Sequence, residues 1–384
     1  MRKKEHYFIA ANFCLLLFIC CNSSGDELDQ SLTTVLDEDA ATISVFVGNK
    51  NQPILVQNAK PDFRPYLHPI LAPDGKGFLT ENSPEHHSHQ TGLYWGFTRV
   101  NGQKIGIDSL MKFFYDPKTE EQKAIKGRDY FHNTGKDYWK RVSFDILDSI
   151  GKKVRWQTVY LMLDADGEPL MKEEQVWSLE LKQEQYLLEL EWNGEAIEEI
   201  VIGEMQYGGM FLRMPWKEGI KGEVINFARQ KNEKAEGQHA LWMDVGMQVE
   251  GRDDMAHIAI FDHPDNRGFP QTWRVDSQLG IGPSRAIMGD WRISKGTTET
   301  IKHGLVVYTG ELNDLDLTEK WKGYVGDYDM YSTAGLWEIA QEEGFNAKFL
   351  TSDEQVAKMT IKDGYEVNAW ASEPMLSLIH ISEP

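Results

Sequence analysis

The chain has 384 residues and is strongly acidic, with 40 Lys and Arg against 60 Asp and Glu side chains and a formal net charge of −20. Such a surface repels nucleic acid and anionic lipid over about a Debye length, so nucleic-acid binding is not expected. A hydrophobic content of 41%, with 12 tryptophans, allows one large β domain or two smaller domains. All three cysteines lie within the first 21 residues, so we expect no disulfide and no Cys-ligated metal in the folded part.

The N-terminus resembles the signal peptide of a bacterial lipoprotein. A basic start precedes an apolar stretch at residues 13–19, which is too short to span a bilayer as a mature helix. Cleavage before Cys21 leaves the small Cys20 at the preceding position, so we predict lipidation of Cys21 after a signal peptide at 1–21. Residues 22–41 are predicted to be a flexible acidic tether. The expected location is the bacterial cell envelope, as a periplasmic or surface-exposed lipoprotein anchored in the outer membrane; the alternative is an ordinary secretory signal.

From residue 42 to 312 the hydrophobic pattern favours β-strands. Large apolar residues occupy every second position from Tyr186 to Trp192, and Asn193-Gly194 is predicted to close that strand. A turn is expected at Asp164–Gly167. The strands expected on this basis are 42–47, 154–163, 175–181, 186–192, 257–261 and 304–308. These elements predict a mainly β fold, a large antiparallel β-sandwich over 42–312, with a mutarotase-like supersandwich as one form of it.

After residue 312 the pattern changes from strand-like to helical. Residues 313–362 are predicted to be a helical linker, with short helices at 315–324, 336–343 and 352–359, and 360–367 resembles the opening of a strand. Residues 363–374 are expected to begin a second, truncated module. Residues 375–384 resemble translated sequencing adapter more than protein and are interpreted as an artefact; a natural apolar tail is the alternative.

The most informative local feature is a histidine-rich segment between Ser83 and Gly96. His87 and His89 are two residues apart, so on an extended strand both would project from the same face. Leu93 and Trp95 would continue that face, which predicts a pocket with polar and apolar walls. Histidine suits both metal ligation and proton transfer near neutral pH.

Several separated blocks resemble the family of proteins labelled "methane oxygenase PmoA". The blocks follow one another in the order of that family over roughly residues 42–312. Many members read Asp-His-Pro-His-His-Arg-Gly in the histidine block, whereas only His87 and His89 match here, since His86, Ser88, Gln90 and Thr91 take the other places. The matching blocks are Arg64–Pro69, Pro73–Gly75, His87–His89, Gly92–Trp95, Asn101–Gly102, Tyr207–Gly209, Arg213, Trp242, Asp244, Phe261–Asn266, Pro270 and Trp273.

The resemblance implies a protein encoded near polysaccharide-degradation genes, and hence a carbohydrate substrate. It does not imply an integral methane monooxygenase, because past the signal the chain has no apolar run long enough to span a membrane. Residues 363–374 are similar to the opening of β-propeller proteins labelled "membrane-bound dehydrogenase", which would make the intact protein a fusion.

Three interpretations of the histidines remain open. In the first, His87 and His89 ligate Zn, Fe or Mn with a third ligand from His68, His263, Glu204 or Asp262. In the second, His87 and His89 perform acid–base catalysis on a sugar without a metal, with the help of Tyr66, Tyr207, Arg64 or Arg213. In the third, the two histidines are hydrogen-bonded interior groups with a structural role only.

Further residues are candidates for substrate binding. Arg64 or Arg213 would hold a carboxylate through two hydrogen bonds, and His68 and His263 each precede a proline that fixes their direction. Tryptophans can stack on sugar rings, although most tryptophans are core residues. The predicted substrate-binding set is Arg64, Tyr66, His68, Trp95, Arg213, His263 and Trp273.

The function predicted from these observations is a cell-envelope lipoprotein that acts on carbohydrate. The reaction favoured is elimination of the lyase or dehydratase type on anionic oligosaccharides, with His87 or His89 moving the proton and Tyr207 assisting. The alternatives are a non-catalytic glycan-binding lipoprotein and a metal-dependent oxygenase or hydrolase. The membrane is expected to be contacted through the lipid anchor only, and the oligomeric state is left undecided.

Overall fold

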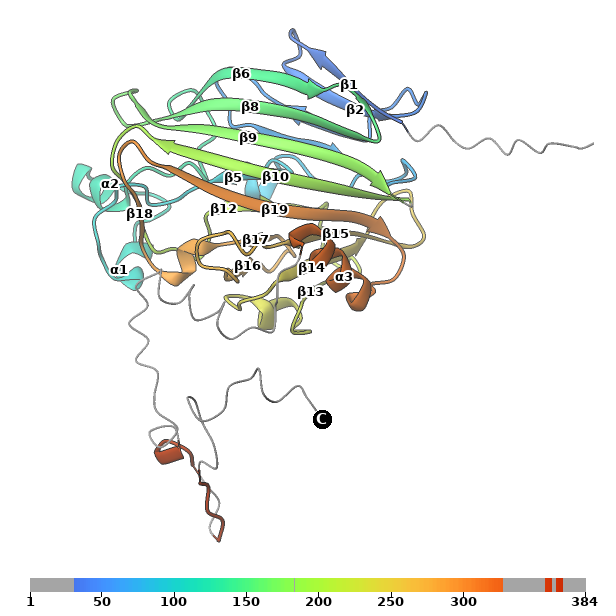
Figure 1. Cartoon of the computed structure of the whole chain (residues 1–384). Helices are drawn as coiled ribbons and strands as arrows, with labels where there is room; N and C mark the ends of the chain where they lie inside the picture. Colours follow the sequence, from blue (N-terminus) through green and yellow to red (C-terminus); the bar gives the residue numbers. More distant parts are fainter. Residues whose placement is uncertain (1–30, 183, 327–355, 361–363, 369–384) are drawn as a thin grey trace, which may run out of the picture.

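The computed structural model describes residues 31–182, 184–326, 356–360 and 364–368. Two large antiparallel sheets pack face to face, and the sheet with the longer strands faces the viewer in Figure 1. The predicted large antiparallel sandwich with a short helical segment near its C-terminal end is therefore confirmed. The signal peptide with Cys21 lies outside the described residues, as do 336–343 and 375–384.

The candidate site described below lies on the nine-stranded sheet and on the loops that connect its strands. Its strand order is β16-β17-β12-β5-β4-β3-β2-β1-β7. Its strands are β1 (Leu32–Asp37), β2 (Thr42–Val47), β3 (Leu55–Asn58), β4 (Tyr66–Ile70), β5 (Leu93–Gly96), β7 (Ile150–Gly151), β12 (Gly209–Leu212), β16 (Trp273–Val275) and β17 (Ile281–Pro283).

The eight-stranded sheet has longer strands and the order β13-β14-β15-β19-β10-β9-β8-β6. Its strands are β6 (Trp139–Asp148), β8 (Lys153–Leu163), β9 (Pro169–Lys182), β10 (Gln185–Ala196), β13 (Gly222–Asn226), β14 (Trp242–Gln248), β15 (Met255–Phe261) and β19 (Thr298–Thr309). A separate pair consists of β11 (Ile200–Ile202) and β18 (Trp291–Ile293).

Short helices occupy the connections. The α-helices are α1 (Ile107–Met111), α2 (Glu120–Lys126) and α3 (Asp314–Val325), and the 3₁₀ helices are η1 (Glu85–His87), η2 (Asn232–Ala235) and η3 (Arg285–Met288). Thr119 caps α2: its hydroxyl accepts from the Gln122 amide while the Gln122 side chain accepts from the Thr119 amide. No helix of the described residues is long and apolar enough to cross a membrane.

The alternation of apolar residues predicted from the sequence for β10 is present in the structure, where it forms part of the core. Tyr186, Leu188, Leu190 and Trp192 are all buried on the inner face of β10. The strand does not end at Asn193-Gly194 as predicted but continues to Ala196. Gly194 is needed inside the strand because a Cβ there would lie 2.1 Å from the indole of Trp192. This glycine therefore makes room for a large side chain and does not form a turn.

Two predicted boundaries are wrong. Residues 32–37, assigned to a flexible tether, form β1, which pairs with β2 from Leu32 opposite Val47. Helix α3, assigned to a linker, packs on the eight-stranded sheet: Trp321 is buried and donates to the carbonyl of Asp262 at 2.8 Å. The folded unit therefore begins before residue 42 and extends past 312. Thr360 and 364–367 are not in a strand.

One carboxyl group is buried between the two sheets. Glu173 on β9 accepts hydrogen bonds from the indole nitrogen of Trp192 at 2.7 Å and from the amide of Gln175 at 3.1 Å. Burial raises the pKa of Glu173 to about 7, although these two donors act in the opposite direction. At neutral pH the core therefore contains a carboxyl group close to its titration midpoint.

Replacing Glu173 with glutamine should stabilise the protein at pH 8 but not at pH 5. The folded-state pKa lies above the ordinary value of 4.5, so stability is lost as the pH rises from about 4.5 to 7. A shift of this size corresponds to about 3 kcal/mol, which is the upper limit of the gain expected for the variant at pH 8. Urea unfolding of both proteins at the two pH values measures it. Glu174→Gln, on the opposite face of β9, is the control, and an equal change in free energy at pH 5 and pH 8 would contradict the prediction.

Candidate functional site

A pocket of about 400 Å³ lies on the outer face of the nine-stranded sheet, within the size range of small-molecule sites. Trp95 on β5 packs toward the other sheet, where its ring stacks on Trp192, so the neighbouring Tyr94 and its strand partner Phe211 face outward. Loops from distant parts of the chain close over this outer face. The pocket is lined by His87, His89, Gln90, Tyr115, Phe131, His132, Tyr207, Phe211, Arg274, Asp276, Ser277 and Gln278.

The histidine segment forms a tight loop and not the strand that we predicted. Ser83 has a φ of 53°, Pro84 follows it, and the amide of His87 donates to the Pro84 carbonyl at 2.8 Å, which starts η1. The two imidazole rings are nevertheless neighbours, with centroids 5.7 Å apart. His87, His89 and Tyr207 thus line one pocket, as the prediction of a shared cavity requires.

His89 is held neutral by its surroundings. Its ring centroid lies 4.5 Å from that of His132. Burial is the main cause that lowers the pKa of His89 to about 3, and the proximity of His132 and Arg64 acts in the same direction. A neutral imidazole can accept a proton or donate a hydrogen bond, but it brings no positive charge to the pocket.

A third histidine is oriented by a carboxylate. His132 Nδ1 lies 3.0 and 2.9 Å from the two oxygens of Asp129, and the His132 amide donates to the same carboxylate. Burial opposes ionisation of Asp129, but the hydrogen bond from His132 and the charge of Lys126, 3.0 Å away, bring its pKa down to about 2. The His132 side chain is 19% exposed, so with Nδ1 bonded to Asp129 its Nε2 is the ring nitrogen left for proton exchange.

Two tyrosines are joined across the pocket. The hydroxyl groups of Tyr115 and Tyr207 are 2.7 Å apart, and both rings lie edge-on to His132 at centroid distances of 5.7 and 5.3 Å. Burial raises the pKa of Tyr207 above its ordinary range, and the hydrogen bond with Tyr115 adds to this effect. Tyr207 therefore keeps its proton at neutral pH. Tyr115 is 64% exposed, so its ring extends from the rim.

The remaining walls are apolar on one side and charged on the other. Phe131 packs against Tyr207 and Phe211 at centroid distances of 5.0 and 5.5 Å. Arg274 on β16 lies over the Tyr207 ring at 5.9 Å and pairs with Glu236 at 2.5 Å. The pocket thus combines a hydrophobic floor, hydrogen-bonding amides and one guanidinium.

Arg64 and Arg213 are not substrate-binding residues, because both are 0% exposed. Arg64 donates to the carbonyls of Phe131 and His89 and stacks over Tyr94 at 3.7 Å. Arg213 donates to Gln90 Oε1 and forms an ion pair with Asp276. They act behind the pocket, where they fix the backbone that presents its lining residues.

None of the other predicted substrate-binding residues lines this pocket. Trp95 and Trp273 are buried in the core, and the Trp273 indole donates to the Ala240 carbonyl at 2.9 Å. Tyr66 is also a core residue. The ring of His68 is within hydrogen-bonding distance of Thr80, at 3.0 Å, and does not line the pocket. These residues support the sheet and cannot stack on a sugar bound at the histidine loop.

The predicted third metal ligands do not join His87 and His89. His263 lines a different hollow, beside Tyr324 and Lys302, and Glu204 lies at a third place, where its amide donates to Asp290 at 2.6 Å. The carboxylate of Asp262 is buried and accepts from Asn266 and the Gln271 amide. Among the residues that the structure describes, no group of three or more His, Cys, Asp or Glu side chains could hold a metal ion. The predicted ligand set therefore does not fit a metal.

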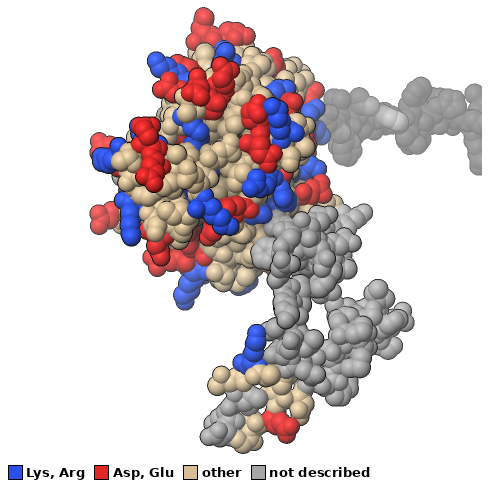
Figure 2. Space-filling view, turned by 90° about the vertical axis from the view of Figure 1, so that its left-hand side faces the viewer, with Lys and Arg blue, Asp and Glu red and all other residues tan. Residues whose placement is uncertain are grey.

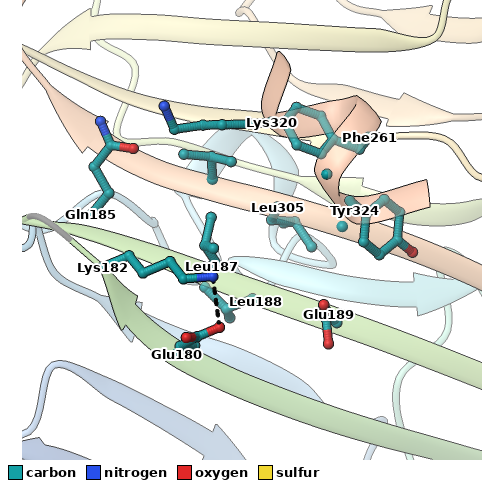
Figure 3. Close-up of a pocket in the computed structure, with 13 residues that line it drawn as sticks. Glu180, Lys182, Gln185, Leu187, Leu188, Glu189, Phe261, Leu305, Lys320 and Tyr324 are labelled. Atoms are coloured by element: carbon teal, nitrogen blue, oxygen red, sulfur yellow. Dashed lines mark ion pairs between the residues drawn. The ribbon is translucent and has the colours of Figure 1, made fainter. Parts of the chain in front are cut away.

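A second hollow, of about 460 Å³, opens on the outer face of the eight-stranded sheet beside α3. Figure 3 shows Leu187 and Leu305 on its strands, Tyr324 and Lys320 on α3, and an ion pair between Lys182 and Glu180. Its lining contains no histidine. We therefore place the candidate chemistry in the histidine pocket.

Sequence reasoning missed His132, Asp129, Tyr115 and Arg274. Asp129 and His132 are three residues apart in a segment without strand periodicity, and that spacing was the only local signal for the pair. Tyr115 and Arg274 reach the pocket only because α1 and β16 fold against it.

The chain belongs to a family of unknown function, DUF6807, which matches residues 51–322. This match does not test the resemblance to the PmoA-labelled proteins or to a dehydrogenase module, and both stay predictions. No curated protein matches the chain.

Solved structures with a similar arrangement have very low sequence identity. A galactose mutarotase-like protein from Lactobacillus casei has a TM-score of 0.33 and 8% identity, over 72% of this chain and 100% of that one. The GH36 α-galactosidase AgaB from Geobacillus stearothermophilus has 0.33 and 7%, over 73% and 41%, and a polysaccharide lyase has 0.30 and 11%, over 76% and 34%. The chain thus spans less than half of the last two proteins. The names of all three proteins refer to a carbohydrate.

Proposed function

We propose that the protein is a carbohydrate lyase that cleaves anionic oligosaccharides by β-elimination in the histidine pocket, with a cell-envelope location implied by its N-terminal signal. The observation that carries the proposal is the pairing of an Asp-oriented imidazole, His132, with a tyrosine that keeps its proton, Tyr207. Both line one opening of suitable size. An acid and a base in separate environments are what an elimination requires.

His132 Nε2 removes the proton from the carbon next to the substrate's carboxylate. The electron pair of that bond forms a carbon–carbon double bond, and the bond to the glycosidic oxygen breaks. The leaving oxygen takes a proton from the Tyr207 hydroxyl, which Tyr115 supports through its hydrogen bond. Arg274 and the amide of Gln278 are the groups placed to hold the carboxylate.

The test is the mass and ultraviolet spectrum of the products from uronate-containing oligosaccharides. Elimination splits the chain without adding water and creates an absorbing unsaturated end, whereas hydrolysis adds one water and creates no such absorbance. Products that carry the mass of water would reject the lyase proposal in favour of a hydrolase.

Tyr207→Phe should lower kcat by about 10²- to 10³-fold with a small change in KM, because the leaving oxygen loses its proton donor while binding contacts stay. Tyr324→Phe, in the hollow beside α3, is the matched control and should keep wild-type rates. A Tyr207→Phe enzyme with more than half of the wild-type kcat would remove Tyr207 from the mechanism.

A glycan-binding protein without catalysis is the second candidate. The exposed ring of Tyr115 at the pocket rim favours it, because exposed aromatic rings stack on sugars. It predicts saturable binding of the same oligosaccharides with unchanged product masses. It also predicts that Tyr115→Ala weakens binding, while Tyr207→Phe, which changes a buried hydroxyl, does not.

A further inference from the structure

Another pocket, of about 720 Å³ and separate from those already described, has a surplus of positive charge on an acidic protein. It lies where the pair β11 and β18 meets the loop at 99–104. Its lining contains the five cationic residues Arg99, Lys104, Arg267, Arg285 and Arg292 but only two acidic ones, Glu199 and Asp290. The chain as a whole has a net charge of −20, so this local excess is opposite in sign to the rest of the molecule.

Figure 2 looks onto the side of the molecule where β18 and α2 lie in Figure 1, and basic side chains stand close together there among acidic ones. The acidic residues do not neutralise the pocket. Arg292 is 3.4 Å from Glu199, and Lys104 is 3.9 Å from Asp290, with the Arg292 and Lys104 side chains mostly exposed. Pairs of this kind are held loosely, so both cations can turn toward an incoming anion.

The inner wall of the pocket has fixed donors. Arg99 is only 3% exposed, and its two terminal nitrogens donate to the carbonyls of Glu204 and Gln103 at 2.8 and 2.9 Å. Its Nε, and the indole nitrogen of Trp291, have no hydrogen-bond partner among the described residues. Arg285 lies over the Trp291 ring at 5.2 Å. Guanidinium groups fixed in this way suit the oxygens of sulfate, phosphate and carboxylate.

The backbone that places Arg99 is strained. Arg99 and Asn101 have φ values of 52° and 56°, which residues other than glycine rarely adopt. The Asn101 side chain holds the loop in place: its Oδ1 accepts from the amide of Val201, and its Nδ2 donates to the carbonyl of Glu199. Backbone strain of this kind concentrates at binding sites, where the surrounding structure maintains it.

We infer that this pocket binds an oxyanion, either as the sulfate or carboxylate substituent of a glycan or as free phosphate. It shares no lining residue with the histidine pocket, so the inference stands whether or not the elimination does. Both pockets are connected to the segment from Glu204 to Tyr207. The Arg99 guanidinium donates to the carbonyl of Glu204, and the Thr98 hydroxyl donates to the carbonyl of Tyr207.

The test is calorimetric titration of the whole protein with three probes: a chondroitin sulfate hexasaccharide, the same hexasaccharide without sulfate, and inorganic phosphate. Arg267→Gln/Arg292→Gln should weaken binding at least tenfold, and raising the salt concentration should weaken it in the wild type. Lys140→Gln/Lys172→Gln removes the same charge from exposed positions on β6 and β9 and should change affinity less than twofold.

The three probes also identify the source of the oxyanion. If both hexasaccharides bind, a carboxylate is sufficient; if only the sulfated one binds, the pocket requires sulfate; if only phosphate binds, the ligand is the free ion. Any of these results supports the site, provided that the Arg267/Arg292 double variant loses the binding. The inference is overturned if none of the probes binds, or if the two double variants lose affinity equally. Arg267 and Arg292 are partly exposed, and melting temperatures near that of the wild type confirm that their replacement leaves the fold intact.

Discussion

Replacing His132 with asparagine should lower kcat/KM on the oligosaccharide substrate by about 10²- to 10⁴-fold, the range expected when a general base is lost. Asparagine keeps a polar group near Asp129 but cannot accept the substrate's proton. Circular dichroism and the melting temperature should stay close to wild type, because His132 is at the edge of the pocket and 19% exposed. The measurement is the initial rate of unsaturated product formation.

The matched control is His263→Asn, in the hollow beside Tyr324. It removes an imidazole of similar burial and should leave kcat/KM within twofold of wild type. If His132→Asn retained more than half of the activity while folded, the base would have to be sought at His87 or His89. Asp129→Asn should also lower kcat/KM, by up to about 10⁴-fold, since an asparagine amide that donates to Nδ1 of His132 leaves the hydrogen on Nε2, and the imidazolium formed in the reaction loses its counter-charge.

Much of the fold could be predicted because the sandwich depends on patterns that are local in the sequence. Alternation along β10 follows from the pleat of a half-buried strand, and a run such as Val154–Leu163 leaves few alternatives. The strand β1 was missed because it has six residues and adjoins an acidic segment, so only its pairing with β2 identifies it. The helical prediction at 315–324 agrees with α3, but its packing on the sheet depends on buried contacts of Trp321 that no periodicity shows.

The site was predicted only in part, because its members meet through tertiary contacts. His87 and His89 stand out in the sequence, and they do share a pocket, although a tight loop and not a strand brings them together. The arginines stand out as well, but a residue type alone cannot show whether a guanidinium faces solvent or lies behind the wall. His132 is a single histidine in an irregular segment. The role of Asp129 becomes evident only from the structure, in which its carboxylate lies within hydrogen-bonding distance of the His132 ring.

Replacing Arg213 with methionine should lower the free energy of unfolding by about 3 to 5 kcal/mol, the cost of breaking a buried ion pair by removing one partner. Arg213 is fully buried, pairs with Asp276 and donates to Gln90 and to the carbonyl of Gln278 at 2.8 Å. Methionine fills similar space without the charge or the donors, so these acceptors lose their partner. Urea unfolding at pH 7 measures the change.

The same variant links stability to the site, because Gln90, Asp276 and Gln278 form two walls of the histidine pocket. Arg155→Met is the control: its ion pair with Asp148, at 3.4 Å, is exposed on the eight-stranded sheet and should contribute less than about 1 kcal/mol. Weakened substrate binding is expected for Arg213→Met alone, since only there do the pocket walls lose their common anchor. If the loss of stability were no greater than that of the control, the two walls would keep their positions without Arg213. The structural role assigned to this arginine would then be withdrawn.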